Sequence, residues 1–260
     1  MSADGRIGDP TRRFTDRAAD YACGRPSYPA ALVDALREGC GLDRSWVVAD
    51  VGSGTGNLSR LFLDAGNRVE AVEPNREMRE AAERAFAGRP GFHSVDGRAE
   101  ATGLAAESVD LVTAGQAFHW FDRELARAEF GRILRPRPER WIALVWNDRQ
   151  AEAGPFMRDY EALLVRHGDD YRQVKRLWPT DEDLARFFGD RPAWKRSLPN
   201  EQLLDREGLR ARARSSSYVP AAGRPGHREL MEALDMLFER HGRQGRVIVP
   251  YVTRLWVGAV

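Results

Sequence analysis

The chain has 260 residues, and its 40 basic and 39 acidic side chains leave a formal net charge of +1, which gives no general reason to expect nucleic acid or a membrane as partner. Two cysteines are too few for a disulfide framework, and no apolar run approaches the roughly 20 residues that span a bilayer. The composition therefore predicts a soluble cytoplasmic protein without a signal peptide, built as one large domain or as a core with an insert.

The first segment with a readable pattern is Phe14–Pro29, which reads F-x-x-x-A-x-x-Y-x-x-x-R-P-x-Y-P. Its two prolines exclude a continuous helix, because proline lacks a backbone donor and restricts the residue before it. The segment carries Tyr21, Arg25 and Tyr28, and its two tyrosines can be ordinary packing aromatics. After it, apolar spacing predicts a helix over Pro29–Leu42.

A glycine-rich loop follows this helix. The stretch Trp46–Asn57 reads WVVADVGSGTGN, and apolar residues recur at helical spacing after it, which predicts a strand, a loop and a helix. Glycine is needed where the backbone takes positive φ or where a bulky ligand touches the main chain. The helix N-terminus that follows offers unpaired N–H groups. Candidate ligand contacts are therefore Gly52, Ser53, Gly54 and Gly56.

An acidic residue ends the next predicted strand, which begins at Arg68. Glu73 lies 17 residues after Gly56, close to the roughly 20-residue offset at which an acid meets a ribose in nucleotide-binding α/β folds. A carboxylate can accept hydrogen bonds from both ribose hydroxyls. Glu73, with Pro74 beside it, therefore indicates an adenosine cofactor. The loop spacing is D-x-G-x-G-x-G, whereas a dinucleotide site has G-x-G-x-x-G.

Three more strands are predicted downstream. Asn75 is a plausible N-cap for a helix that places Met78 on an apolar stripe, and Phe92–Val95 is the third strand. The fourth, Val109–Ala114, is apolar enough for a parallel sheet and runs into Gly115–Phe121, GQAFHWF. Open α/β sheets build their ligand crevices at such strand ends.

The fifth strand, Arg140–Trp146, follows a helix that Asp122 is expected to cap. The resulting order, β-α-β-α-β-β-α-β, predicts a doubly wound parallel sheet with helices on both faces. After it, residues 148–190 hold two amphipathic helices, the second with a capping box between Thr180 and Asp183. We expect this insert to form a helical lid over the strand ends.

The remaining chain is expected to complete the sheet, with strands at Trp194–Leu198 and Val252–Val257 and a helix over Glu201–Arg214 between them. The predicted organisation has three parts. A Rossmann-like core with its N-terminal segment covers 1–147, the lid covers 148–190, and the completion of the core covers 191–260.

Three of these segments resemble one family. The D-x-G-x-G-x-G loop resembles motif I of the class I S-adenosylmethionine (SAM)-dependent methyltransferases. The segment Gln116–Phe121 resembles motif IV of their small-molecule, trans-aconitate methyltransferase-like group, and the N-terminal pattern resembles the segment that folds over the methionine end of the cofactor in that group. The resemblance implies a seven-stranded sheet with a reversed β-hairpin edge.

The resemblance also implies SAM as cofactor and S-adenosylhomocysteine (SAH) as product. Because Arg98 stands where family members often carry an acid, we expect the adenine contacts from Ala99 and Glu100; Met78 suits either the adenine or the core. Arg25 would face a carboxylate. The implied cofactor contacts are Tyr21, Arg25, Gly52, Ser53, Gly54, Gly56, Glu73, Pro74, Met78, Ala99, Glu100, Gln116 and Ala117.

The acceptor is expected to be a small organic molecule. Candidate substrate contacts are Tyr28, Phe118, His119, Trp120, Trp146, Arg172 and Trp178. His119 is the candidate general base, with an ordinary pKa near 6.5, or else it packs between its aromatic neighbours. Arg172, Lys175 and Arg176 have the spacing of one helix face, which suits an anionic acceptor if turned inward and a solvated surface if turned outward.

Methyl transfer from SAM is an in-line displacement, so the main task of the protein is proximity and orientation. No metal site is predicted, and the chain is expected to act as a monomer or homodimer without nucleic acid or membrane partners. Two alternatives remain. One is a nicotinamide-dependent oxidoreductase on a similar fold, which the glycine spacing and the QAFHWF segment disfavour; the other is a non-catalytic SAM-binding protein.

Overall fold

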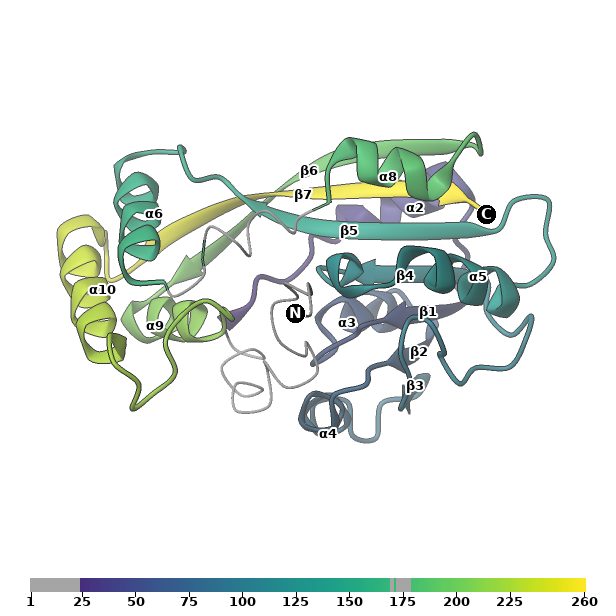
Figure 1. The fold of residues 1–260 in the computed structure, drawn as a ribbon, viewed down its shortest axis with the longest axis horizontal. Coiled ribbons are helices and arrows are strands. Elements are labelled where there is room, and N and C mark those ends of the chain that lie inside the picture. The colour runs from purple at the N-terminus through teal and green to yellow at the C-terminus, as the bar shows by residue number, and fades with distance from the viewer. Residues whose placement is uncertain (1–23, 169–170, 172–178) are drawn as a thin grey trace, which may run out of the picture.

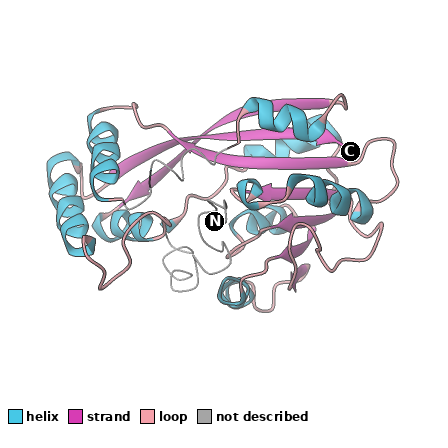
Figure 2. Ribbon diagram, in the orientation of Figure 1, coloured by secondary structure: helices cyan, strands magenta, loops and turns pink. Residues whose placement is uncertain are grey.

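The computed structural model describes residues 24–168, 171 and 179–260, and its strands form one seven-stranded sheet in the order β3-β2-β1-β4-β5-β7-β6 (Figures 1 and 2). The strands are β1 Val47–Val51, β2 Arg68–Val72, β3 Phe92–Val95, β4 Leu111–Gly115, β5 Trp141–Arg149, β6 Ala193–Leu204 and β7 Val247–Ala259. The helices are α2 Ala31–Cys40, α3 Asn57–Asp64, α4 Arg76–Ala85, η2 Phe118–Trp120, α5 Arg123–Ile133, α6 Pro155–His167, α8 Asp181–Phe188, α9 Arg206–Arg214 and α10 His227–His241.

The predicted order of the first five strands is confirmed, and local caps explain where its helices begin. The Asn75 side chain accepts a hydrogen bond from the Met78 N–H at the start of α4. Asp122 does the same for the Leu125 N–H at the start of α5. Each side chain satisfies a donor that the first helical turn would leave unpaired.

Helices cover both faces of the sheet, as a doubly wound fold requires. On one face α2, α3 and α4 bury a cluster that includes Phe62 and Phe86. On the other face α5 and α8 bury a cluster that includes Phe130 and Phe187. Strands between two apolar layers have no solvent side, which explains the continuous apolar runs of β1 and β4.

One strand, β7, runs opposite to the other six. β7 lies between β5 and β6 and pairs antiparallel with both, so the reversed hairpin edge is confirmed. The helix expected from Glu201 was placed too early, because Glu201–Leu204 belongs to β6 and α9 begins at Arg206 after the Asp205 cap. β6 is a largely exposed edge strand, so its polar sequence carries little periodic signal.

The two helices of the segment after β5 pack in different places. α6 packs against α10 in a third hydrophobic cluster, where Tyr160 is fully buried. α8 begins with the predicted capping box between Thr180 and Asp183 and packs against α5 and β7. A lid action of this segment, like the three-part division of the chain, stays a prediction.

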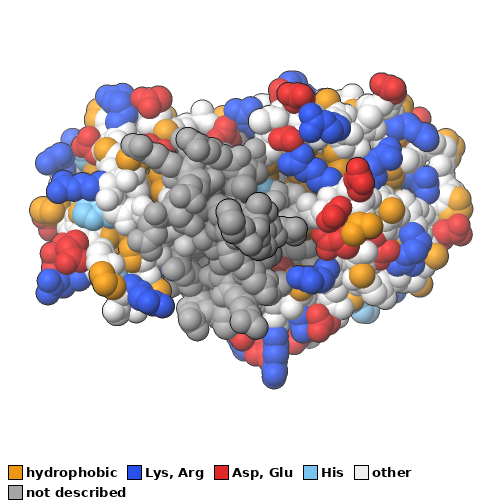
Figure 3. Space-filling model, viewed as in Figure 1, with side chains coloured by type: hydrophobic (Ala, Val, Ile, Leu, Met, Phe, Trp, Pro, Cys, Tyr) orange, Lys and Arg blue, Asp and Glu red, His pale blue; other side chains and the backbone are white. Residues whose placement is uncertain are grey.

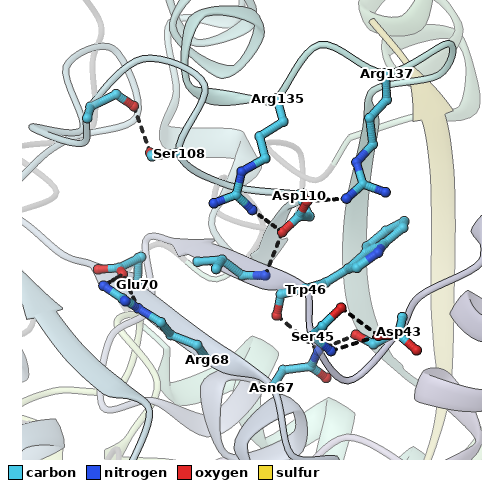
Figure 4. Close-up of polar contacts among 12 residues, drawn as sticks. Asp43, Ser45, Trp46, Asn67, Arg68, Glu70, Ser108, Asp110, Arg135 and Arg137 are labelled. Carbon is cyan, nitrogen blue, oxygen red and sulfur yellow. Dashed lines mark hydrogen bonds and ion pairs between the residues drawn. The ribbon is translucent and has the colours of Figure 1, made fainter.

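A buried carboxylate joins the amino-terminal ends of β1 and β4, away from the glycine loop (Figure 4). Asp110 is 4% exposed and accepts a hydrogen bond from the Val47 N–H at 2.8 Å. It also pairs with Arg135 and, at 2.5 Å, with Arg137. These contacts hold the strand register on which the opposite ends of the strands depend.

We expect Asp110→Ala to lower the free energy of unfolding by about 2–3 kcal/mol, because the Val47 N–H loses its buried acceptor and two arginines lose their partner. Urea denaturation measures the change. The matched control is Asp64→Ala, which removes an exposed partner of Arg89 and should cost less than about 1 kcal/mol. Equal losses in both variants would contradict a special role for the buried carboxylate.

Candidate functional site

The glycine loop packs too closely against its neighbours to carry side chains at two positions. Gly52 has a φ of 71°, and a Cβ there would lie 2.6 Å from the Cβ of Ala117. Gly56 has a φ of 85°, and a Cβ there would lie 2.4 Å from the ring of Phe86. Glycine is therefore required by both backbone conformation and space, and the main chain of the loop stays close to the edge of the sheet.

Glu73, directly after β2, is held by the backbone of the loop. One carboxylate oxygen accepts a hydrogen bond from the Gly54 N–H and the other from the Asn75 N–H, each at 2.9 Å. Burial raises the pKa of this carboxyl above its usual range, although the two hydrogen bonds oppose the shift. A carboxylate has about four acceptor positions, so Glu73 can still accept from a ligand.

Asp50, within β1, is a second buried carboxylate at the same edge. One oxygen accepts a hydrogen bond from the Ser59 hydroxyl at 2.6 Å, and the other, Oδ1, has no hydrogen-bond partner. Burial raises the pKa of Asp50 to about 6. The side chain borders the pocket described next, so it places an uncompensated acceptor there. Sequence analysis did not select Asp50 as a site residue, although it is the first residue of the D-x-G-x-G-x-G motif.

A pocket joins the glycine loop to the segment that begins at Gly24. Its lining residues are Arg25, Pro26, Tyr28, Asp50, Gly52, Ser53, Asn57, Leu58, Gly115, Gln116 and Asn147. Residues predicted from three distant parts of the sequence therefore share one site. Asn57 and Asn147 line it as well, although sequence reasoning did not select them.

Asn147, in β5, ties the N-terminal segment to the sheet beside this pocket. Its Nδ2 donates to the Ser27 carbonyl at 3.2 Å, and its Oδ1 accepts from Thr253 at 2.5 Å and from Asn200 at 3.1 Å. Asn200 also donates to the Ser27 carbonyl, at 2.8 Å. We call this group, Asn147, Asn200 and Thr253 with the Ser27 carbonyl, the Ser27 clasp. Its three side chains lie on β5, β6 and β7, so only the strand register brings them together.

The end of β4 turns sharply before it enters η2. Gln116 has a φ of 58°, and its side-chain oxygen accepts a hydrogen bond from the Asn147 N–H at 3.2 Å. A non-glycine residue in this left-handed region is uncommon, and here the amide contact with the neighbouring strand holds it. Gln116 therefore turns the following residues away from the sheet.

His119, in η2, lies among aromatic rings. Its ring centroid is 4.4 Å from that of Trp120 and 5.2 Å from that of Trp146. Burial, followed by the positive charge of Arg25, lowers the pKa of His119 to about 3. The imidazole is therefore neutral at pH 7, and its Nδ1 is buried without a hydrogen-bond partner.

Several other predicted contact residues are buried in the core or hydrogen-bonded within the chain. Phe118 is 1% exposed and packs against Phe187 with ring centroids 4.8 Å apart. Like His119, Trp120 and Trp146 it does not line the pocket, and its contact with substrate stays a prediction. Ala99 is buried in the core, and the Glu100 side chain accepts a hydrogen bond from the Asp122 N–H at 2.8 Å. Met78 is also buried, whereas Pro74 is partly exposed beside Glu73. Tyr21, Arg172 and Trp178 lie outside the described residues.

On the face shown in Figure 3, basic and acidic side chains are interspersed among the described residues, so no large area there carries charge of one sign. Within residues 24–168, 171 and 179–260, no group of three or more histidine, cysteine or acidic side chains is arranged to hold a metal ion. No helix in those ranges combines the length and apolar character needed to cross a membrane.

Comparison with known proteins identifies the family. Residues 49–138 match the family model described as a methyltransferase domain. The chain is 30% identical over 248 residues to an uncharacterized methyltransferase of Mycobacterium tuberculosis, covering 94% of each chain. It is 32% identical over 160 residues to an uncharacterized methyltransferase-like protein of Schizosaccharomyces pombe, where the match spans 61% of this chain and 60% of the relative.

The fold is also shared with solved structures. A crystal structure from Anabaena variabilis, described as a methyltransferase from an antibiotic biosynthesis pathway, superposes with a TM-score of 0.61 at 22% identity, covering 92% of this chain and all of the other. At that identity the match supports the fold alone. Together with the relatives and the glycine-loop edge, it leads to one conclusion. The chain belongs to the class I SAM-dependent methyltransferases, and its cofactor is S-adenosylmethionine.

Proposed function

We propose that this chain transfers the methyl group of SAM to a small organic acceptor by in-line displacement. The observation that carries the proposal is the pocket, which extends from the glycine loop at Gly52 and Ser53 to Arg25, Tyr28 and Asn147. Bound SAM supplies a methyl group already activated by its sulfonium. The residues around the pocket would hold the acceptor atom in line with that methyl, a positioning effect worth roughly 7–11 kcal/mol.

The residues present suit the polar groups of SAM. Glu73 has free acceptor positions for ribose hydroxyls, and the two backbone hydrogen bonds orient its carboxylate. The unpartnered Oδ1 of Asp50 would accept from the ammonium of the methionine moiety. The loop glycines leave no side chain between these acids and the main chain. Tyr21, Met78, Ala99, Glu100 and Ala117 remain proposed contacts of lesser weight.

Glu73→Gln should weaken SAH binding about 100-fold. Both oxygens of Glu73 face backbone N–H donors, so an amide nitrogen at either position would oppose a donor and disturb the ribose acceptor. Isothermal calorimetry with SAH measures the loss. Glu70→Gln, on the same strand but paired with Arg68, is the control and should leave SAH affinity within twofold. NAD, titrated in parallel, should not bind; tight NAD binding without SAH binding would instead support the oxidoreductase.

Asp50 should make both stability and cofactor affinity depend on pH. Its folded pKa of about 6 exceeds the usual 3.8, so its contribution to stability is fully present below pH ~4 and is lost as the pH rises through about 6. Relative to Asp50→Asn, the wild type should lose about 2–3 kcal/mol of unfolding free energy between pH 4 and pH 8.

Cofactor affinity should change in the opposite direction. The ammonium of SAH favours ionised Asp50, so wild-type affinity should rise between pH 5 and pH 7 while that of Asp50→Asn stays flat. Urea denaturation and calorimetry at matched pH values give the two readouts. A wild type and variant with parallel pH profiles would rule out Asp50 as the titrating group.

The acceptor side of the site is proposed to be an aromatic wall of His119, Trp120 and Trp146 beside Tyr28. A histidine with a pKa of about 3 is a weak base at neutral pH, so it is better suited to contact the acceptor than to remove a proton. The proposal therefore favours acceptors whose attacking atom is already deprotonated, such as a carboxylate or thiolate.

His119→Asn tests this assignment. We expect KM for the acceptor to rise several-fold while kcat stays within about threefold, because positioning is lost but no proton transfer is removed. A loss of kcat of about 100-fold or more, restored by raising the pH, would identify His119 as the general base. SAH calorimetry on the same variant checks that the cofactor half is intact.

The small-molecule assignment is tested by methyl transfer from labelled SAM to a panel of small acids, thiols, amines and phenols, with tRNA and a cell-protein fraction as further arms. The formal net charge of +1, with basic and acidic side chains interspersed among the described residues on the face shown in Figure 3, favours the small acceptors. Label found only in RNA or protein would overturn the proposal. SAH binding with no transfer to any arm would favour a non-catalytic SAM-binding protein.

A further inference from the structure

A second cluster of buried charge lies where α6 and α9 meet the far ends of β5 and β7. We call it the arginine–tyrosine cluster, and its members are Arg149, Tyr160, Glu161, Tyr171, Arg212, Tyr218 and Tyr251. Arg149 is 9% exposed and Arg212 is 4% exposed. Two buried guanidiniums near each other are costly unless negative charge compensates them.

The chain compensates this charge only in part. Arg149 donates to Glu161 and to the Tyr171 hydroxyl, each at 2.8 Å. Arg212 donates to the Tyr251 hydroxyl at 2.7 Å and to the Ser216 hydroxyl at 2.9 Å, both neutral partners. Within the described ranges, no ion pair involves Arg212, and Glu161 is the one carboxylate paired with either arginine. With their tyrosine hydroxyls protonated, the described members of the cluster therefore carry a net charge of +1.

Two donors of the cluster have no acceptor. The Nε of Arg149 and the hydroxyl of Tyr160 are both buried without a hydrogen-bond partner. The two residues are neighbours, because the guanidinium carbon of Arg149 lies 5.2 Å from the centroid of the Tyr160 ring. Buried polar groups in folded proteins are nearly always paired, so adjacent unpaired donors beside excess positive charge indicate a missing anion.

The positive charge of the two arginines also affects the pKa of Tyr218. Burial alone would raise the pKa of its hydroxyl, but the charges of Arg149 and Arg212 outweigh burial and lower the pKa to about 7. Hydrogen bonds from Ser216 and Arg149 lower this pKa as well, and below it Tyr218 is a neutral phenol that adds no counter-charge to the two arginines.

The cluster adjoins the pocket through covalent and hydrogen-bonded links. Arg149 lies two residues after the pocket residue Asn147, so both side chains are on the same face of β5. Arg25, another pocket residue, donates to the Ser215 carbonyl at 2.8 Å, next to Ser216. No cluster residue lines the pocket itself, but the two share one wall, the face of β5 that carries Asn147 and Arg149.

We propose that the arginine–tyrosine cluster binds a carboxylate of the methyl acceptor. The acceptor would extend from this anchor along the shared wall, with its reacting atom toward the pocket. A monoanion matches the net charge of +1. A phosphate dianion would exceed that charge and would be repelled by the carboxylate of Glu161. This inference rests on the proposed function for the identity of the ligand as acceptor, but the anion site itself can be tested without it.

The test uses thermal unfolding of the full chain with sodium formate, the smallest carboxylate, against formamide and against sodium chloride at equal ionic strength. Formate should raise Tm saturably beyond chloride, since a ligand that binds only the folded state stabilises it, and formamide should not. Arg212→Gln should weaken the apparent formate affinity at least tenfold. Arg196→Gln, which removes an exposed charge on β6, is the matched control and should leave the affinity unchanged.

Tyr160→Phe is a second variant that tests the anion site even when Arg212→Gln fails to fold. It removes an unpaired buried hydroxyl, so the protein should be at least as stable, yet formate should bind about tenfold more weakly because the hydroxyl no longer donates to the anion. Formate behaving like chloride in the wild type, or retaining full affinity in Arg212→Gln and Tyr160→Phe, would overturn the anion site.

The link to the acceptor is tested with each active acceptor and its amide. Arg212→Gln should raise KM at least tenfold for the carboxylate and leave the amide unaffected. SAH calorimetry separates the two proposals. Normal SAH binding without carboxylate preference overturns this inference alone, whereas absent SAH binding overturns the proposed function.

Discussion

One carboxylate holds the cofactor edge of this molecule together. Glu73 accepts hydrogen bonds from Gly54 in the loop after β1 and from Asn75 in the turn after β2. β1 and β2 are parallel and in register up to the pair Val51 and Val72, so the two turns emerge side by side. The side chain then fixes the spacing between them, and the helix caps and glycine conformations that follow depend on that spacing.

The site has two halves of different physical character. The proposed cofactor half consists of backbone groups and acids where parallel strands end, and Asp50 leaves one oxygen there without a partner. The other half is built from side chains of the antiparallel strands, where Arg149 and Arg212 leave positive charge uncompensated. On the two proposals, a cationic cofactor and an anionic acceptor would each meet opposite charge, so the electrostatic field would orient both ligands in addition to the shape of the site.

The sequence was most informative where a local pattern has a local cause. The glycine spacing, the caps at Asn75 and Asp122, and the acid after β2 are each readable within a few residues, and the resemblance supplied the reversed edge. The edge strand β6 was partly misread, because most of the strand is exposed and its polar sequence carries little periodic signal.

Features built from distant residues could not be predicted in this way. The Ser27 clasp joins residues from three strands and the N-terminal segment, and the arginine–tyrosine cluster joins β5, α6, α9 and β7. Neither has a sequence spacing of its own. Both follow from the register that pairs Arg149 with Tyr251 and Asn147 with Thr253, and register is a property of the assembled sheet.

The extension of β5, β6 and β7 past the parallel strands has a consequence for how such a protein can diversify. The extended ends and α6, α9 and α10 form their own hydrophobic cluster, separate from the two that surround the glycine loop. With the acceptor bound there as proposed, substitutions in that cluster would change acceptor recognition without disturbing the packing of the two clusters around the glycine loop. New specificities can therefore arise at one end of the molecule while the chemistry at the other end is inherited intact.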